Sequence, residues 1–245
     1  MICLSLDTTT DIASIALTDD THLLAEYSFS QHRDLSCRLI PNIKTMLKDC
    51  GLEMRSIQAI GVSTGPGSFT GLRIGVVTAK TLAQVLDVPV VGISSLDLLS
   101  LQFTYLPDAV VCPIIKVRKG EVYYTLFRMN GSSMERISEY SANPVQTMID
   151  DIRNTETGKV IFCGDGLPDN AEAIQSAMGD DAFVVPSWLS YPKGYLLACE
   201  AVRLIQAGLG ADAYTLMPFY IRKSTPEIRL EEALRERLKA EGVSA

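Results

Sequence analysis

Residues 63–75 read STGPGSFTGLRIG, and this glycine-rich stretch is the most specific motif of the chain. An apolar run at 57–63 precedes it and an apolar helical pattern follows as far as Leu86, so the glycines lie at a strand-to-helix junction. Ser68 or Thr70 can cap the helix, and backbone N–H groups at a helix start bind anions readily. No Gly-Lys-Ser/Thr follows, which excludes a Walker A loop. A tight turn with close backbone packing is the plainer interpretation.

The segments around this junction alternate between strand and helix patterns. The predicted strands lie at 2–6, 12–18, 23–29, 57–63, 88–93, 109–117, 121–128, 159–163 and 182–186. The predicted helices lie at 33–50, 69–86, 95–103, 144–153, 169–178 and 194–207. The second half repeats the order of the first in a degraded form, which predicts an α/β fold with two related lobes of mixed sheet plus helices.

The lobe boundary is expected near Leu106-Pro107-Asp108. We therefore expect an N-terminal lobe at 1–105 and a second lobe at 106–222, with the helix at 194–207 packing back on the first lobe. Residues 223–245 form a charged C-terminal tail, which is either a surface helix or a frayed end.

Small residues recur every four positions along the helix at 69–86, and most of its other residues are apolar. A helix that is apolar nearly all round needs burial on two sides, and a small-residue stripe lets another backbone approach closely. We expect this helix and the one at 33–50 to form a partner interface, with burial inside the monomer as the alternative. The expected interface residues are Leu35, Leu39, Ile43, Gly71, Leu72, Gly75, Val76, Ala79 and Ala83.

A second polar feature follows the first strand, where Asp7 is succeeded by three threonines. A carboxylate and hydroxyls at a hairpin tip can hold a metal ion or phosphate oxygens, although an ordinary turn is the alternative. Together with the glycine-rich stretch this predicts a weak nucleotide or phosphate contact. Its expected residues are Asp7, Thr8, Thr9, Gly65, Gly67 and Ser68.

Composition limits the other functions of the chain. The net charge is −7 without a basic stripe, so we expect tRNA or other nucleic acid to be held only indirectly. The six cysteines form no CxxC pair, and His22 and His32 lack metal-site spacing, so neither a metal nor a catalytic site is expected. No signal peptide or membrane-spanning run is recognised, and the expected location is the cytoplasm.

The strand end Asp7-Thr8-Thr9-Thr10 and the stretch 63–75 together closely resemble the bacterial TsaB (YeaZ) family. Residues 120–123 (GEVY) and 218–222 (PFYIR) are also similar to that family, so the resemblance spans about 2–222. It implies an actin-like, sugar-kinase-like fold. It also implies a non-catalytic subunit of the machinery that makes threonylcarbamoyladenosine at position 37 of tRNA.

The resemblance implies partners as well. They are a TsaD-type catalytic paralogue and a TsaE-type ATPase, with a homodimer through the same helices when the protein is alone. No cofactor is expected, and a nucleotide at the partner interface stays open. The catalytic paralogue carries an HxxxH metal pair, whereas the corresponding stretch here runs from His32 to Ser36 without a second histidine. Residues 116–119 (KVRK) also depart from the family, because a basic residue replaces an acidic one.

Two alternatives come from other functional classes. An ATP-dependent small-molecule kinase or nucleotide hydrolase of the same fold needs a second phosphate loop, for which Gly164-Asp165-Gly166 is the one candidate. A glycoprotease-like metallopeptidase of the M22 type needs metal ligands that the sequence does not offer.

Overall fold

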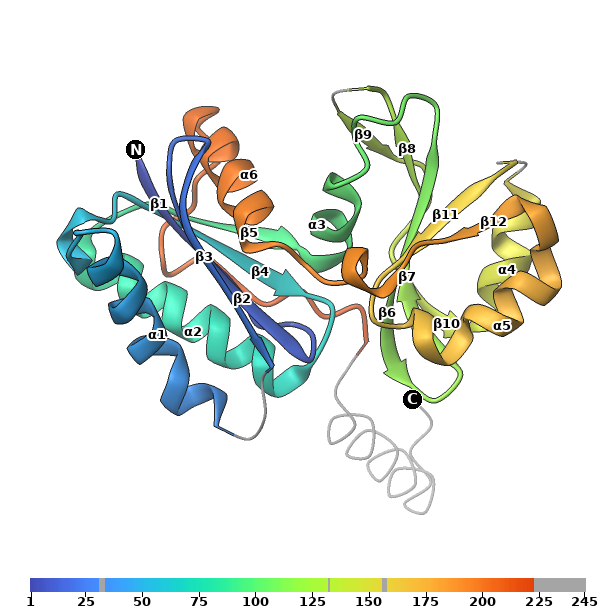
Figure 1. The fold of residues 1–245 in the computed structure, drawn as a ribbon, viewed down its shortest axis with the longest axis horizontal. Coiled ribbons are helices and arrows are strands. Elements are labelled where there is room, and N and C mark those ends of the chain that lie inside the picture. The colour runs from blue at the N-terminus through green and yellow to red at the C-terminus, as the bar shows by residue number, and fades with distance from the viewer. Residues whose placement is uncertain (31–33, 132, 156–157, 223–245) are drawn as a thin grey trace, which may run out of the picture.

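A computed structural model of the chain describes residues 1–30, 34–131, 133–155 and 158–222. It has two lobes, each built on a β-sheet with helices against it (Figure 1). The first sheet has the order β3-β2-β1-β4-β5, in which β3, β2 and β1 pair antiparallel and β1, β4 and β5 pair parallel. Its strands are β1 (Ile2–Asp7), β2 (Ile12–Asp19), β3 (His22–Ser30), β4 (Ala59–Gly65) and β5 (Val90–Ser94).

Helices cover both faces of the first sheet. Leu4 and Leu6 of β1 pack in one apolar cluster with α1 (Leu35–Asp49) and α2 (Phe69–Leu86). Cys3 packs in another with α6 (Gly194–Gln206), and the Ser5 hydroxyl donates to Gly194 O at 2.7 Å. Alternate residues of the strand therefore point to opposite helical layers, as the period of two requires.

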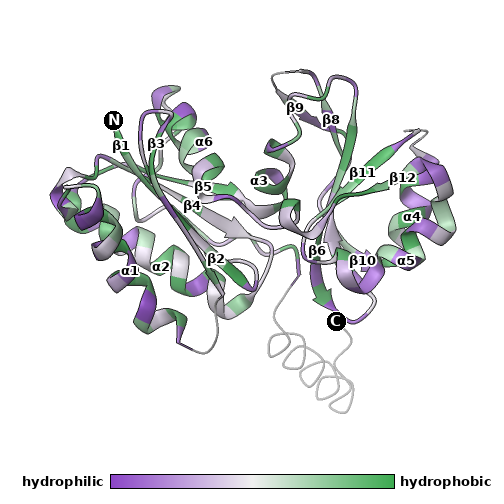
Figure 2. Cartoon of the chain, in the orientation of Figure 1, coloured by the Kyte–Doolittle hydropathy of each residue, from purple (hydrophilic) through white to green (hydrophobic). Residues whose placement is uncertain are grey.

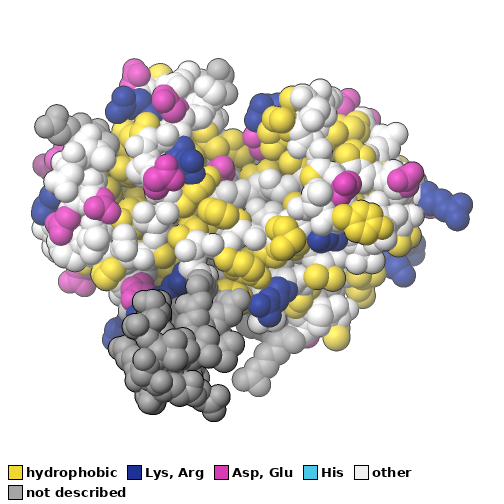
Figure 3. Space-filling view, turned by 180° about the vertical axis from the view of Figure 1, so that it is seen from behind, with side chains coloured by type: hydrophobic (Ala, Val, Ile, Leu, Met, Phe, Trp, Pro, Cys, Tyr) yellow, Lys and Arg dark blue, Asp and Glu magenta, His cyan; other side chains and the backbone are white. Residues whose placement is uncertain are grey.

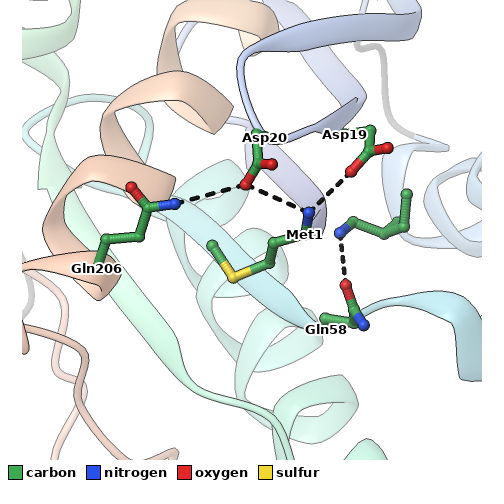
Figure 4. Close-up of polar contacts among 6 residues, drawn as sticks. Met1, Asp19, Asp20, Gln58 and Gln206 are labelled. Atoms are coloured by element: carbon green, nitrogen blue, oxygen red, sulfur yellow. Dashed lines mark hydrogen bonds and ion pairs between the residues drawn. The ribbon is translucent and has the colours of Figure 1, made fainter.

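The N-terminus and the end of α6 meet at the turn between β2 and β3 (Figure 4). The Met1 ammonium lies 2.8 Å from Asp19 Oδ1 and 3.2 Å from Asp20 Oδ1. Gln206 Nε2 donates to the same Asp20 carboxylate at 3.4 Å, and Ile2 N donates to Gln58 Oε1 at 2.8 Å. These contacts tie α6 to the first lobe although it follows the second lobe in sequence.

The second sheet has the order β10-β7-β6-β11-β12, and β8 pairs with β6 and β9 beside this path. Helices α4 (Val145–Asn154) and α5 (Leu167–Met178) cover the face that points away from the first lobe (Figure 1). The strands are β6 (Val110–Arg118), β7 (Glu121–Tyr124), β8 (Phe127–Met129), β9 (Met134–Arg136), β10 (Ser141–Pro144), β11 (Val160–Cys163) and β12 (Ala182–Val184).

The prediction of a single strand at 121–128 is wrong, because the structure has two strands there, β7 and β8. At the break, Leu126 N donates to Ser138 Oγ at 2.8 Å and the Thr125 hydroxyl donates to Ser138 O at 2.9 Å. These groups therefore bond to a loop instead of continuing the ladder. The three-residue β8 then pairs with the beginning of β6 at Val110 and Val111.

Helix α3 (Ser95–Leu101) lies between the two lobes. Its Leu98 joins the cluster of the first sheet and α6, whereas its Leu96 and Leu99 join the core of the second lobe. The hydropathy colouring shows apolar residues along the strands and on the sheet-facing sides of the helices (Figure 2). Because α3 contributes to both cores, it fixes the lobes to each other.

A C-terminal strap, residues 211–222, makes a second connection between the lobes. It begins at Ala211, whose N donates to Val90 O at 2.8 Å, and Lys80 of α2 donates to Leu216 O at 2.8 Å. Further along, Phe219 N donates to Thr64 O at 2.8 Å, and Arg222 pairs with Glu121 of β7 at 2.8 Å. The strap thus runs along α2 and ends on the second sheet.

The ends of α1 and α2 follow the sequence signals. Gly51 after α1 has φ +68°, and Leu52 N bonds back to Leu47 O at 2.8 Å, which closes the helix as expected. Pro41 lies inside α1, beyond its first turn. Ser68 caps α2, because its side-chain oxygen accepts from Gly71 N at 3.3 Å. The tail at 223–245 and His32 lie outside the described residues.

Candidate functional site

The polar side chains at the end of β1, Asp7 and Thr8, form hydrogen bonds within the first lobe. The buried Asp7 carboxylate accepts from Thr9 N at 3.0 Å and from the Thr9 hydroxyl at 3.1 Å. The Thr8 hydroxyl donates to Gly71 O at 2.7 Å, at the beginning of α2. Burial raises the pKa of Asp7 above its ordinary value, although the bonds from Thr9 oppose that shift. Asp7 and Thr8 therefore hold the loop against α2.

A cavity of about 340 Å³ lies between the lobes. Of the six residues expected to contact a phosphate, Thr9, Gly67 and Ser68 line it. Asp7, Thr8 and Gly65 are not among its lining residues, and a Cβ added to Gly65 would lie 2.9 Å from Phe219 O of the strap. The predicted set is therefore brought together only in part. The other lining residues are Thr10, Asp11, Phe69, Lys116, Val117, Arg118, Tyr123, Asp165 and Arg222.

The cavity-lining basic residues of the second lobe and the strap form ion pairs within the chain. Lys116 pairs with Asp169, and Arg118 pairs with Glu121. Glu121 also accepts from Arg222 at 2.8 Å. The basic departure noted at 116–119 is thus compensated by acidic side chains nearby. Arg118 and Arg222 lower the pKa of Glu121, mainly through the Arg118 hydrogen bond, so this carboxylate stays ionised.

Asp165 is a carboxylate that lines the cavity and whose pKa is shifted. Its Oδ1 accepts from Lys116 N at 3.0 Å. Burial, with a smaller contribution from the nearby charges of Asp11 and Asp7, raises the pKa of Asp165 to about 6. Sequence reasoning singled out residues 164–166 only as a phosphate loop. It missed Tyr123, Asp165 and Arg222 as neighbours, because three separate segments bring them together.

The nine residues expected at a partner interface are buried inside the single chain, which favours the alternative of burial within the monomer. Leu72 and Ala79 are 1% and 0% exposed, and both pack in the core with strands of the first sheet. A Cβ added to Gly75 would lie 2.2 Å from Thr8 Oγ1, which explains the need for glycine there. The small residues of α2 serve its close approach to β1.

The opposite side of α2 remains apolar at the surface. Val77 and Val85 are 61% and 76% exposed. The strap adds Tyr214, Met217 and Tyr220, which are 74%, 68% and 42% exposed. We call these five residues the outer face. Seen from behind, hydrophobic side chains gather near the middle of the molecule (Figure 3).

Contacts between α2 and the strap make the outer face one surface. Gln84 Nε2 donates to the Tyr214 hydroxyl at 2.8 Å, and Phe69 stacks on Tyr220 with ring centroids 4.9 Å apart. Arg73 Nε donates to the Tyr220 hydroxyl at 3.4 Å. Val77 lies one turn along the helix from Arg73, so the two side chains are neighbours on the surface of α2.

Two kinds of feature are absent from residues 1–30, 34–131, 133–155 and 158–222. No group of three or more His, Cys, Asp or Glu residues there has an arrangement suited to a metal ion. Within the same residues, no helix has the length and hydropathy that a membrane crossing requires.

Comparisons with known proteins match this chain to proteins named for tRNA threonylcarbamoyl chemistry. The family model described as "TsaD: tRNA N6-adenosine threonylcarbamoyltransferase" matches residues 22–229. A Bacillus subtilis protein named tRNA threonylcarbamoyladenosine biosynthesis protein TsaB is 29% identical, over 95% of this chain and 99% of its own length. The Escherichia coli protein of the same name is 27% identical, over 76% of this chain and 82% of its own.

Solved structures show the same fold. A Pseudomonas aeruginosa protein described as similar to peptidase YEAZ superposes with a TM-score of 0.76 at 25% identity, covering 90% of this chain and 99% of that one. The structure titled YeaZ from Pseudomonas aeruginosa gives a TM-score of 0.74 at 23% identity, with the same coverage. The prediction of an α/β fold with two related lobes of mixed sheet plus helices is confirmed. The chain belongs to the TsaB (YeaZ) family.

Proposed function

We propose that this protein is a non-catalytic subunit in the biosynthesis of threonylcarbamoyladenosine at position 37 of tRNA. It binds and activates a TsaD-type catalytic paralogue together with a TsaE-type ATPase, and it forms a homodimer when alone. The curated relatives from Bacillus subtilis and Escherichia coli carry the name of this biosynthesis. With a net charge of −7, the chain leaves tRNA binding to its partners.

The observation that carries the proposal is the outer face. Exposed apolar side chains that form one patch mark protein interaction sites more often than isolated ones do. Val77 and Val85 project from a long helix, and Tyr214, Met217 and Tyr220 extend the patch along the strap. A helical face of a paralogous domain is the partner surface that suits such a patch. The proposed interface therefore keeps helix α2 but uses its outward side.

The non-catalytic role rests on how the first-lobe residues are used. The Asp7 carboxylate accepts from Thr9, and the Thr8 hydroxyl donates to Gly71 O, so both groups serve the internal structure of the lobe. In the sequence, Ser36 stands where an HxxxH pair starting at His32 would have its second histidine. The catalytic centre of the assembly is then that of the paralogue.

Threonylcarbamoyl transfer to tRNA tests this function directly. The reaction contains the purified catalytic paralogue, the threonylcarbamoyl-adenylate donor and the TsaE-type ATPase with ATP, with or without this protein. We expect product only when this protein is added to the paralogue. Product from this protein without the paralogue would refute the non-catalytic role, and transfer that is independent of it would refute the subunit role.

The outer face is tested by Val77→Arg, with Phe183→Arg of β12 as the matched control. The two apolar side chains are equally exposed, Val77 at 61% and Phe183 at 62%, but Phe183 lies in the second lobe. We expect Val77→Arg to melt like the wild type, to be monomeric by light scattering and to lose binding to the paralogue. Phe183→Arg is expected to keep both associations. Equal behaviour of the two variants would remove the outer face from the interface.

A further inference from the structure

The interlobe cavity carries acidic and basic groups in separate clusters. Asp11 and Asp165 interact electrostatically with each other, and both interact with Lys116. Tyr123 interacts instead with Arg222 and with Glu121. All of these except Glu121 line the cavity of about 340 Å³, which is near the lower end of the size of ligand pockets. The cavity thus has one acidic cluster, Asp11 and Asp165, and a separate cluster formed by the Tyr123 hydroxyl and the Arg222 guanidinium.

Tyr123 is a largely buried polar side chain with a hydroxyl that is open to a ligand in the cavity. Tyr123 is 6% exposed and lines the cavity. Within the described residues, its hydroxyl has no hydrogen-bond partner. The hydroxyl oxygen keeps solvent access within the cavity, so it is free to donate to a ligand that enters there. A ligand oxygen placed in the cavity would supply the missing acceptor.

Arg222 and the two aspartates have bonding capacity left. Arg222 donates through Nη1 to Glu121 at 2.8 Å, and a guanidinium has five N–H donors. Asp165 accepts Lys116 N at 3.0 Å, and Asp11 makes no hydrogen bond or ion pair with the described residues. An ionised carboxylate can accept several hydrogen bonds, so both can receive N–H donors from a ligand.

The same contacts disfavour a nucleotide or a free phosphate. Glu121 is shared by Arg118 and Arg222, which leaves about one positive charge there, and Lys116 is paired with Asp169. Asp11 and Asp165 oppose it, so the cavity offers no excess positive charge to a polyphosphate. At the beginning of α2, Ser68 N already donates to Thr9 O at 2.7 Å and Gly71 N to Ser68 Oγ. Two of the backbone donors near this helix start are therefore already used, which weakens it as an anion site.

We propose that the interlobe cavity binds a small zwitterion of amino-acid size. The ligand ammonium lies between Asp11 and Asp165, and its carboxylate accepts from Tyr123 and Arg222. A zwitterion satisfies the unpaired hydroxyl and both charged groups without adding net charge to the cavity. This inference is independent of the proposed subunit role, because it concerns binding by the isolated chain.

A series of ω-amino acids tests the proposal. Glycine, β-alanine, γ-aminobutyrate and 5-aminovalerate are titrated into ¹⁵N-labelled protein, with butyrate, butylamine, inorganic phosphate and ATP as comparison ligands. We expect saturable shifts of the Gly67 and Lys116 amides with one or two neighbouring members of the series. Butyrate and butylamine, which each keep one charge, are expected to bind about tenfold more weakly or worse.

Two variants with matched controls complete the test. Tyr123→Phe removes the hydroxyl alone, and the exposed Tyr105 gives the control Tyr105→Phe. Asp11→Asn removes one charge, and the exposed Asp180 gives the control Asp180→Asn. We expect Tyr123→Phe and Asp11→Asn to weaken binding about tenfold while both controls bind normally. Shifts at these amides with phosphate or ATP but with no amino acid would overturn the proposal. So would unchanged affinity of both cavity variants, or no binding in the whole series.

Discussion

The strand path β3-β2-β1-β4-β5 of the first lobe recurs as β10-β7-β6-β11-β12 in the second, with two antiparallel pairings followed by two parallel ones. The helices that follow β4 and β11 differ. Helix α2 has 18 residues with small buried positions and an apolar outward side, whereas α5 has 12 residues. The exposed positions of α5 include Asp169, Glu172, Gln175 and Ser176. The outward side of α5, the helix that corresponds to α2 in the second lobe, is thus polar. The fold itself therefore does not require the outward side of α2 to be apolar.

The largest expected effect is a loss of stability from substitutions on the inward side of α2, compared with its outward side. Gly75→Leu and Ala79→Arg place bulk or charge where the helix meets the sheet, since Ala79 is 0% exposed. We expect each to lower the free energy of unfolding by about 4 kcal/mol or more. Chemical denaturation measures this, with Val77→Arg as the outward control that should stay within about 0.5 kcal/mol. A native melting curve for Gly75→Leu would mean that the stripe is not internal packing.

The helix itself was predictable, but its orientation was not. Apolar and small residues at three- and four-residue spacing in 69–86 give the helix from sequence alone. Because α2 is apolar nearly all round, its periodicity does not say which side faces the sheet. The side is decided by the close approach of Thr8 to Gly75, which depends on the packing of β1 under α2.

The cavity shows the same limit. Thr9, Gly67 and Ser68 could be placed there because turns at the carboxyl ends of neighbouring parallel strands lie at one edge of a sheet. Tyr123 and Arg222 come from a second-lobe strand and from the strap, 99 residues apart in number, and no local pattern joins them. The strand break after Tyr124 was also missed, since it depends on bonds from residues 125 and 126 to Ser138.

The next effect compares the glycine turns of the two lobes. Gly65 after β4 and Gly164 after β11 have φ +103° and +109°, so alanine strains both backbones alike. An added Cβ would lie 2.9 Å from Phe219 O at Gly65 but 2.1 Å from Ile114 O at Gly164. We expect Gly164→Ala to destabilise the protein by about 2 kcal/mol more than Gly65→Ala. Denaturant titration of both variants measures the difference.

Gly131→Ala is the control for backbone strain alone. Gly131 has φ +79°, and a Cβ there would meet nothing within 4 Å. We expect it to cost about 1 kcal/mol. If Gly164→Ala cost no more than this control, the close packing of the second-lobe turn against β6 would not contribute to stability.

A smaller effect concerns the strap that joins the lobes. Tyr220 stacks on Phe69 at the beginning of α2. The hydroxyl of Tyr214 instead accepts a hydrogen bond from Gln84, and its ring stacks on no other aromatic ring among the described residues. We expect Tyr220→Ala to cost about 1 kcal/mol more than Tyr214→Ala, which is the usual value of an aromatic pair. Thermal melting of both variants tests this. Equal losses would show that the strap does not hold the first lobe through this stack.

The smallest effect is the pH dependence of the two Gly-X-Gly turns, Gly65-Pro66-Gly67 and Gly164-Asp165-Gly166. Only the second contains a titrating group. Burial raises the pKa of Asp165 from 3.8 to about 6, so the folded state binds a proton more tightly than the unfolded state. The stability from this proton is therefore present below pH 4 and is lost as the pH rises through about 6.

Asp165→Asn removes this titration and keeps an oxygen that can accept from Lys116 N. We expect its unfolding free energy, relative to the wild type, to rise between pH 4.5 and pH 7.5 by somewhat less than about 1 kcal/mol, because solvent screens a half-buried carboxylate. Groups such as Asp7 titrate in both proteins and cancel in the difference. Denaturant titration at both pH values measures it, with Asp180→Asn as the exposed control. A difference that fell with rising pH would mean that the Lys116 hydrogen bond outweighs burial, and that this turn stabilises its lobe through an ionised carboxylate.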